Sequence, residues 1–202
     1  EGWPGVPAPG ALTACVVRSA MANRGQFASS DPLLNRIHAQ VRWTEESNLH
    51  GVPTDCPQRN ERMGWLNDLA ARAEELVHNF DAMRLLEKFV GDIADAQDPR
   101  SGSVSDTAPF HWGRQPADPV SVAWLLIPWL LHQNKGETRL LARHYEGFRR
   151  WVDHLTAQAR DGIVQFSRYG DWAPPAGEAV SGSIGSGAIS AKTPCELISN
   201  AY

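Results

Sequence analysis

The stretch GVPTDCPQRNERMGWLND, residues 51–68, combines two prolines, a cysteine, two arginines, a tryptophan and three acids. If a helix begins near Asn60, then Glu61, Trp65 and Asp68 are spaced i, i+4 and i+7 and lie on one helical face. Asp55 then approaches from the preceding loop. Because neighbouring carboxylates repel each other, this cluster is favourable only if something binds to it.

A sugar matches the chemistry of this cluster. Its hydroxyls donate hydrogen bonds to ionised acids, its apolar face covers an indole, and one protonated acid can protonate a glycosidic oxygen. A purely structural interpretation also stays open. Glu61 would favour the positive end of a helix dipole, Asp55 would cap the helix, and Asp68 would pair with Arg72 at i+4.

Apolar residues recur with helical spacing along most of the chain. The spacing predicts helices over 32–41, 65–77, 83–93, 120–132 and 141–155. Asp31-Pro32 and Asp118-Pro119 have the residue types of an N-cap followed by N1, and Thr193-Pro194-Cys195-Glu196 has the form of a capping box that opens a sixth helix. GIVQF (162–166) predicts a short strand, and residues 97–117 and 176–190 predict loops.

These elements predict an all-α architecture of helical hairpins, in which the long loops are expected to carry function. The first residues differ, because ALTACVVRSA (11–20) has the β-branched composition of a strand. A domain boundary is therefore expected near Ser29. A helical-repeat scaffold is the alternative architecture, but no self-similarity with a fixed period is evident.

Composition excludes several classes of function. The net charge of −4 comes from 19 basic and 23 acidic residues without a basic block, so no nucleic-acid partner is expected. Three widely spaced cysteines do not favour a disulfide framework, and no metal site is predicted. The apolar run 120–132 contains Pro128 and is too short for a bilayer, so no membrane association is expected. The start of the chain shows no export signal and has the character of the interior of a longer chain, and the compartment stays open.

Four motifs occur in the order expected for one enzyme family. VPTDCPQRNERMGWLND, IPWLL (127–131), GDWAPP (170–175) and TPCELISNAY (193–202) together resemble the catalytic domain of bacterial α-L-rhamnosidases of glycoside hydrolase family 78. The resemblance implies an (α/α)6 barrel, or toroid, that follows β-sandwich domains. On this basis, residues 1–29 are expected to end a preceding β-rich domain and its linker, and residues 30–202 to form about the first half of the barrel.

The same resemblance implies an inverting hydrolase that removes terminal α-L-rhamnose without a cofactor. Glu61 matches the general acid, and the general base is expected beyond Tyr202, so neither Glu178 nor Glu196 is assigned to that role. The substrate-binding residues implied are two acids for the sugar hydroxyls, an arginine in the carboxylate network and three aromatic walls around the sugar and its 6-methyl group: Asp55, Asp68, Arg59, Trp65, Trp112 and Trp172.

Two positions depart from the family pattern. Trp112 is taken to replace an aromatic residue that usually stands shortly before the acid matched by Asp118, and Asn67 replaces a glycine. Arg62 is an alternative to Arg59 in the carboxylate network. Two alternative functions also remain: another inverting (α/α)6 glycosidase that acts on glucosides or uronic-acid sugars, and a sugar-binding helical domain without catalysis.

Overall fold

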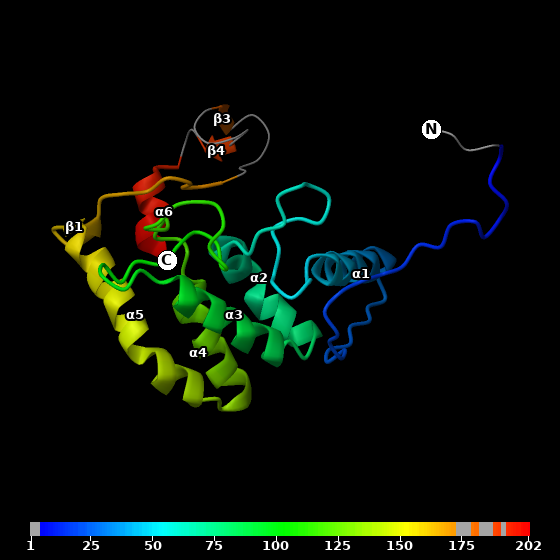
Figure 1. Ribbon diagram of the computed structural model, residues 1–202, viewed down its shortest axis with the longest axis horizontal. Helices are drawn as coiled ribbons and strands as arrows, with labels where there is room; N and C mark the ends of the chain where they lie inside the picture. Colours follow the sequence, from blue (N-terminus) through cyan, green and yellow to red (C-terminus); the bar gives the residue numbers. More distant parts are fainter. Residues whose placement is uncertain (1–4, 173–178, 182–187, 191–192) are drawn as a thin grey trace.

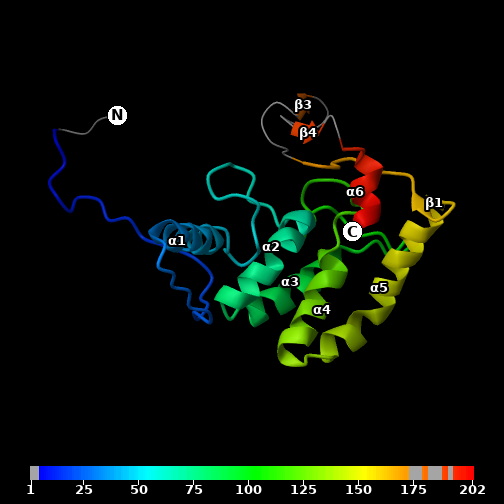
Figure 2. The same ribbon diagram turned by 180° about the vertical axis from the view of Figure 1, so that it is seen from behind.

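Six α-helices dominate the computed structural model, which describes residues 5–172, 179–181, 188–190 and 193–202. The all-α prediction is confirmed for these residues, and Figures 1 and 2 show the arrangement from opposite sides. The elements in chain order are α1 (Pro32–Ser47), α2 (Leu66–Asn79), α3 (Met83–Ala96), α4 (Ala123–Lys135), α5 (Arg139–Ala157), β1 (Ala159–Arg160), β2 (Ile163–Val164), β3 (Ala179–Ser181), β4 (Ala188–Ser190) and α6 (Cys195–Ala201).

The hydrophobic core lies between α2, α3, α4 and α5. Helix α4 contacts each of the other three, as Figure 1 shows for the green and yellow helices. The predicted spacing of α3 is confirmed, because its four core residues Leu86, Phe89, Val90 and Ile93 are at most 1% exposed. Helix α4 is predominantly apolar and continues through Pro128. It ends at Lys135, and the C-cap residue Gly136 has a left-handed backbone and donates its N–H to the His132 carbonyl at 2.7 Å.

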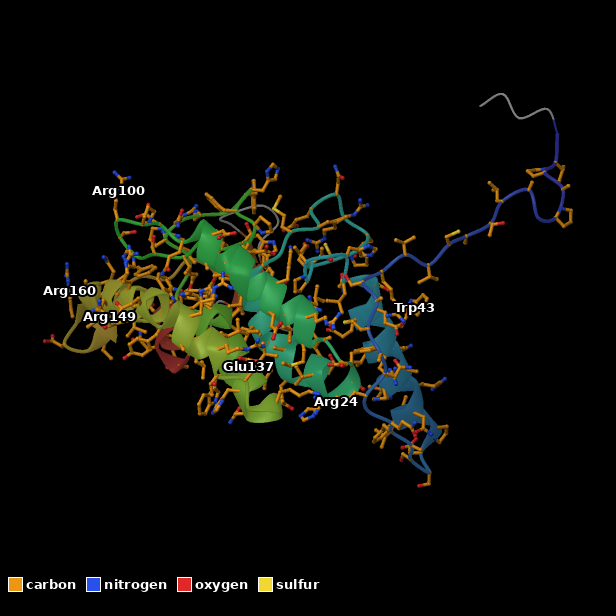
Figure 3. All side chains as sticks on the ribbon, turned by 60° about the horizontal axis from the view of Figure 1, so that its bottom comes forward. Arg24, Trp43, Arg100, Glu137, Arg149 and Arg160 are labelled. Atoms are coloured by element: carbon orange, nitrogen blue, oxygen red, sulfur yellow. The ribbon has the colours of Figure 1, made fainter. Side chains whose placement is uncertain are left out.

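Helix α1 lies to one side of this core (Figures 1 and 2). It begins as predicted, since the Asp31 carboxylate accepts the Leu33 N–H at 2.8 Å and Pro32 occupies the first turn. Its apolar residues remain solvent-accessible, however, with exposed fractions between 38% and 51% for Leu33, Leu34, Ile37 and Val41. Trp43, labelled in Figure 3, is exposed as well.

The predicted helix start near Asn60 is wrong. Residues 51–65 form a loop, and α2 begins at Leu66 with Trp65 at its N-cap. The loop is stabilised by two hydrogen bonds between Asp55 and Met63. The Asp55 N–H donates to the Met63 carbonyl at 3.1 Å, and the Met63 N–H donates to Asp55 Oδ1 at 2.9 Å. Glu61, Trp65 and Asp68 therefore do not share a helical face.

Two predictions of helix capping are also wrong, because the side chains expected to cap the helices bond to distant residues. Helix α4 begins at Ala123 rather than after Asp118-Pro119, because the buried Asp118 carboxylate accepts the backbone N–H of Tyr169 at 2.9 Å. Helix α6 has Pro194 at its N-cap without a side-chain capping bond. The Thr193 hydroxyl instead donates to Asp171 Oδ2 at 2.9 Å.

The strand predictions have mixed outcomes. The short strand in GIVQF is confirmed as β2, which pairs with β1 across a two-residue turn at Asp161-Gly162. The predicted loop 176–190 contains the antiparallel pair β3 and β4, while residues 176–178 and 182–187 of that prediction lie outside the described residues. Residues 11–20 form no strand, so their assignment to a β-rich domain stays a prediction.

Some charged side chains project outward from the molecule, and Arg149 on α5 is labelled in Figure 3. Arg149 on α5 pairs with Glu146 at 2.9 Å and with Asp153 at 3.0 Å, in the i,i+3 and i,i+4 positions of a solvated helix face. Within the described ranges, none of the helices combines the length and apolar character that a membrane span requires.

Candidate active site

Residues 51–68 line a pocket of about 350 Å³, together with side chains from two later loops. This volume falls in the range of roughly 300–1,000 Å³ that is typical of small-molecule sites. All seven predicted site residues lie around it: Asp55, Arg59, Glu61, Trp65, Asp68, Trp112 and Trp172. Sequence reasoning missed four other lining residues, Cys56, Asn67, Ser121 and Tyr169.

Glu61 is oriented by Trp65. The indole N–H of Trp65 donates to Glu61 Oε1 at 2.7 Å, and both side chains are partly buried. Gly64 lies between them against the core, where a Cβ would overlap the Ala108 carbonyl oxygen and come within 2.8 Å of the Phe89 ring. The second carboxyl oxygen of Glu61 has no hydrogen bond to the described residues.

Asp55 is held beside Glu61 by its own loop. Its Oδ1 accepts the Met63 N–H, and its Oδ2 accepts the Cys56 S–H at 2.5 Å. The ligand atoms of Asp55, Cys56 and Glu61 all lie within 4.8 Å of one another, a spacing that a cation could bridge. Burial, and next the hydrogen bond to Asp55, raise the pKa of the Cys56 thiol, so the thiolate that soft metals require is disfavoured. The expectation of no metal stays a prediction.

Asp68 lies in the first turn of α2 and lines the pocket. Its pKa is raised from 3.8 to about 6, chiefly because the pocket walls withhold water from the carboxyl and next because Asp55 is negatively charged nearby. The side chain keeps accessible surface, but this surface faces the concave pocket, so exposure and partial desolvation coexist. The positive charge of Arg72 opposes the shift.

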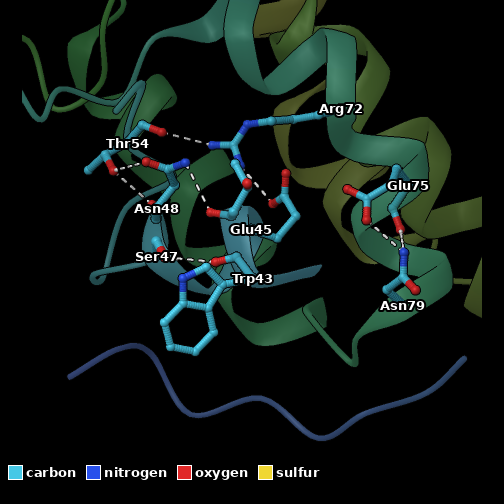
Figure 4. Close-up of polar contacts among 9 residues, drawn as sticks. Trp43, Glu45, Ser47, Asn48, Thr54, Arg72, Glu75 and Asn79 are labelled. Carbon is cyan, nitrogen blue, oxygen red and sulfur yellow. Dashed lines mark hydrogen bonds and ion pairs between the residues drawn. The ribbon is translucent and has the colours of Figure 1, made fainter. Parts of the chain in front are cut away.

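Arg72 does not form the alternative pair with Asp68. Instead it donates to Glu45 Oε2 at 2.7 Å and to the Thr54 carbonyl at 3.0 Å, as Figure 4 shows. Glu45 is 4% exposed, and a buried carboxylate of this kind requires a partner. Arg72 therefore connects α2 to α1 and to the residue that precedes Asp55.

We expect Asp68→Asn to stabilise the fold at neutral pH. The carboxyl ionises near 3.8 in the unfolded chain but near 6 in the folded chain, so the folded state binds more protons between these values and stability falls as pH rises. The destabilisation is complete above pH 6 and absent below 3.8. Thermal unfolding of the full-length protein should show a higher Tm for Asp68→Asn at pH 7.5 and little change at pH 4. An equal shift at both pH values, or an equal effect of the exposed control Asp81→Asn, would contradict this assignment.

Four aromatic rings form a connected wall of the pocket. Trp65 meets Trp112 and Tyr169 edge-on, with centroids 5.7 Å apart in each pair, and Tyr169 meets Trp172 edge-on at 5.8 Å. Trp112 and Trp172 are 49% and 43% exposed, so they present free apolar surface. Tyr169 was not singled out from the sequence, and its position three residues before Trp172 is the signal that could have identified it.

The carboxylates that line the pocket in the described part of the chain are Asp55, Glu61 and Asp68. Glu196 is exposed on α6 and is not among the lining residues. Glu178 lies outside the described residues. An inverting glycosidase needs its second carboxyl about 6.5–9.5 Å from the acid, whereas an Asp55 oxygen lies within 4.8 Å of Glu61.

Comparison with known proteins identifies the family to which this chain is similar. The family model for the bacterial α-L-rhamnosidase 6 hairpin glycosidase domain matches residues 22–202. The structure of the α-L-rhamnosidase from Dictyoglumus thermophilum is 40% identical, with a TM-score of 0.89, over 98% of this chain and 21% of that protein.

Two other similar proteins are also α-L-rhamnosidases. The Streptomyces avermitilis α-L-rhamnosidase complexed with L-rhamnose is 28% identical, with a TM-score of 0.82, over 98% of this chain and 18% of that protein. An α-L-rhamnosidase from Alteromonas sp. strain LOR is 28% identical over 95% of this chain and 20% of the relative. The chain thus spans about a fifth of the length of the proteins it matches.

Proposed function

The chain belongs to the bacterial α-L-rhamnosidase six-hairpin glycosidase domain family, and on this premise we propose that the full-length protein hydrolyses terminal α-L-rhamnosides. The prediction of an (α/α)6 barrel is confirmed by the family and by the similar structures, with this chain supplying a part of the barrel. The observation that carries the proposal is the convergence of three carboxylates and three indoles on one pocket.

Glu61 is proposed as the general acid. The Trp65 N–H fixes Oε1, which leaves Oε2 as the oxygen that carries the transferable proton. A proton on this oxygen can pass to the glycosidic oxygen as the bond to the sugar breaks, so that the leaving group departs as a neutral alcohol. Glu61 is partly buried and lines the pocket beside the Trp65 indole, which places its carboxyl where a glycosidic oxygen of a bound sugar would lie.

The remaining lining residues are proposed to bind the sugar. Asp55 and Asp68 accept hydrogen bonds from hydroxyls, and the exposed Arg59 supplies a positive charge at the rim of this acidic cluster. The amide of Asn67 has no hydrogen-bond partner in the described part of the chain and offers both a donor and an acceptor to a ligand. The indoles of Trp65, Trp112 and Trp172 suit the 6-methyl group and apolar face of rhamnose.

An inverting mechanism is proposed, with a general base contributed by a part of the full-length protein other than the described residues. The short separation of Asp55 and Glu61 supports this division of roles, because Asp55 leaves no room for a water on the opposite face of the sugar ring. The same separation makes Asp55 the nucleophile to consider in a retaining mechanism, where the two carboxyls lie about 5–5.5 Å apart. The anomer released first distinguishes the two.

Substrate class is tested with two chromogenic glycosides that share one aryl leaving group. We expect the full-length protein to hydrolyse the aryl α-L-rhamnoside and not the matched aryl glucoside, because the pocket wall around the sugar is aromatic. Hydrolysis of the glucoside alone would support the other inverting glycosidases. Binding of L-rhamnose without hydrolysis of either substrate would support a sugar-binding domain.

The aromatic wall is expected to contribute modestly to affinity. Trp65→Ala and Trp172→Ala should each weaken sugar binding by roughly 0.5–1.5 kcal/mol, or about 2–13-fold in KM, through loss of an aromatic contact. Trp129→Ala is the matched control, because Trp129 is an exposed tryptophan of α4 that does not line the pocket. Unchanged kinetics for both wall variants would show that these indoles serve only packing.

A further inference from the structure

Asp106 lies beneath the pocket, where the segments that carry its aromatic walls meet. The residue is fully buried, at 0% exposed. Its Oδ2 accepts the Arg114 backbone N–H at 2.7 Å and the Tyr169 hydroxyl at 2.9 Å, and its Oδ1 accepts the Asp118 N–H at 3.1 Å. Arg114 follows Trp112 by two residues, so one carboxylate connects the Trp112 loop to the segment of Tyr169.

The backbone around Asp106 reaches the remaining wall. Its carbonyl accepts the Leu66 N–H at 2.9 Å, directly after Trp65. The next residue, Thr107, forms a β-bridge with Trp65, and its hydroxyl donates to the Trp112 carbonyl at 2.5 Å. Residues 106 and 107 therefore contact, through side chain or backbone, the segments that carry all four rings.

The space around the carboxylate is tightly occupied. Gly113 adopts a left-handed φ of +100°, and a Cβ at that position would lie 3.0 Å from the Asp106 Cβ and 3.3 Å from its Oδ2. A second fully buried carboxylate, Asp118, accepts the Tyr169 N–H at 2.9 Å. Burying a carboxylate is unfavourable unless its oxygens are hydrogen-bonded, and both carboxylates here accept hydrogen bonds from Tyr169, which lines the pocket.

We propose that Asp106 is a positioning residue that sets the spacing of the aromatic walls through the Tyr169 hydroxyl and the Arg114 N–H. Asp106 does not line the pocket, so it acts on the sugar only through these walls. The proposal rests on the proposed rhamnoside hydrolysis. It adds that sugar affinity depends on a buried carboxylate. Proton transfer from Glu61 is expected to depend on it less, because Glu61 is oriented by Trp65, and the Trp65 segment is held by the backbone of residues 106 and 107 rather than by the Asp106 carboxylate.

The test compares three variants of the full-length protein. Tyr169→Phe removes one hydrogen bond to Asp106 and keeps the ring. Asp106→Asn places an amide NH₂ among donors. Asp98→Asn is the matched control, because Asp98 is a carboxylate of the same long loop that accepts the Ser101 N–H at 2.6 Å and does not line the pocket. The readouts are KM and kcat on an aryl α-L-rhamnoside, and the tryptophan region of the near-ultraviolet circular dichroism spectrum.

We expect Tyr169→Phe to raise KM by about 10-fold, the loss expected for one hydrogen bond to a charged group, with kcat within roughly 2-fold of the wild type. Asp106→Asn should raise KM further, and both variants should alter the tryptophan circular dichroism while Asp98→Asn changes neither quantity. If Asp106→Asn does not fold, Tyr169→Phe alone decides the matter.

Two results would overturn the inference. The first is a KM for Tyr169→Phe that equals the KM of Asp98→Asn. The second is a rise in KM matched by an equal-fold fall in kcat, with an unchanged tryptophan circular dichroism spectrum. Failure of the wild-type protein to hydrolyse the rhamnoside would refute the proposed function instead. In that case the circular dichroism comparison still decides whether Asp106 positions the tryptophans.

Discussion

Replacement of Glu61 by glutamine is expected to lower kcat on a natural rhamnoside by about 10²–10⁴-fold, the usual contribution of general acid catalysis. Glutamine keeps the oxygen that accepts the Trp65 N–H, so the side chain should stay in place. It cannot give a proton to the glycosidic oxygen. A substrate whose leaving group is stable as an anion needs no proton, and its hydrolysis should be affected much less.

The ratio of the two losses is the informative quantity. Steady-state kinetics of the full-length Glu61→Gln variant on a natural rhamnoside and on an activated aryl rhamnoside measure it. Glu196→Gln is a suitable control, because Glu196 is an exposed glutamate of α6 outside the pocket lining. Equal losses on both substrates would mean that Glu61 only orients the sugar. Asp68, with a pKa of about 6, would then be the next carboxyl to test as the acid.

Residues 1–202 produced alone are expected to be inactive and to aggregate. The pocket carboxylates of the described residues all come from one wall, residues 51–68, so no group there can activate water from the opposite side of the sugar. Helix α1 also leaves the apolar residues Leu33, Leu34 and Ile37 about half exposed, and contiguous apolar surface of this kind promotes association.

Size-exclusion chromatography and an aryl rhamnoside assay measure both parts of this prediction, with the full-length protein in the same buffer as the control. We expect the short chain to elute as aggregate and to show no hydrolysis above the buffer background. A soluble monomer that hydrolyses the rhamnoside would contradict the prediction. It would require a second catalytic carboxylate within this chain.

Periodic apolar spacing was sufficient to predict most of the helices. The core positions of α3 and the Asp31-Pro32 start of α1 depend on local geometry, and both were predicted correctly. The starts that failed depend on distant partners. Asp118 bonds to Tyr169, and Thr193 bonds to Asp171, and no local pattern reveals either contact.

In the candidate site, too, features that depend on local sequence were predicted, and features that depend on distant partners were missed. Seven residues were named from motifs, and the structure gathers them around one pocket, although through a loop rather than the predicted helical face. The contact between Glu61 and Trp65 was expected from a helix, in which residues four apart are neighbours. The structure forms the same contact within a loop. The role of Asp106 was missed because its contact with Tyr169 joins positions 63 residues apart in the sequence.

The central claim is that the full-length protein releases rhamnose with inversion, with Glu61 as the acid and the base outside the described residues. One measurement tests it most directly: the proton NMR spectrum of the first product formed from an α-L-rhamnoside, recorded before the anomers equilibrate. We predict that β-L-rhamnose appears first. Initial release of α-L-rhamnose would contradict the account and would point to a retaining pair formed by Glu61 and Asp55, and release of no rhamnose would refute the proposed activity.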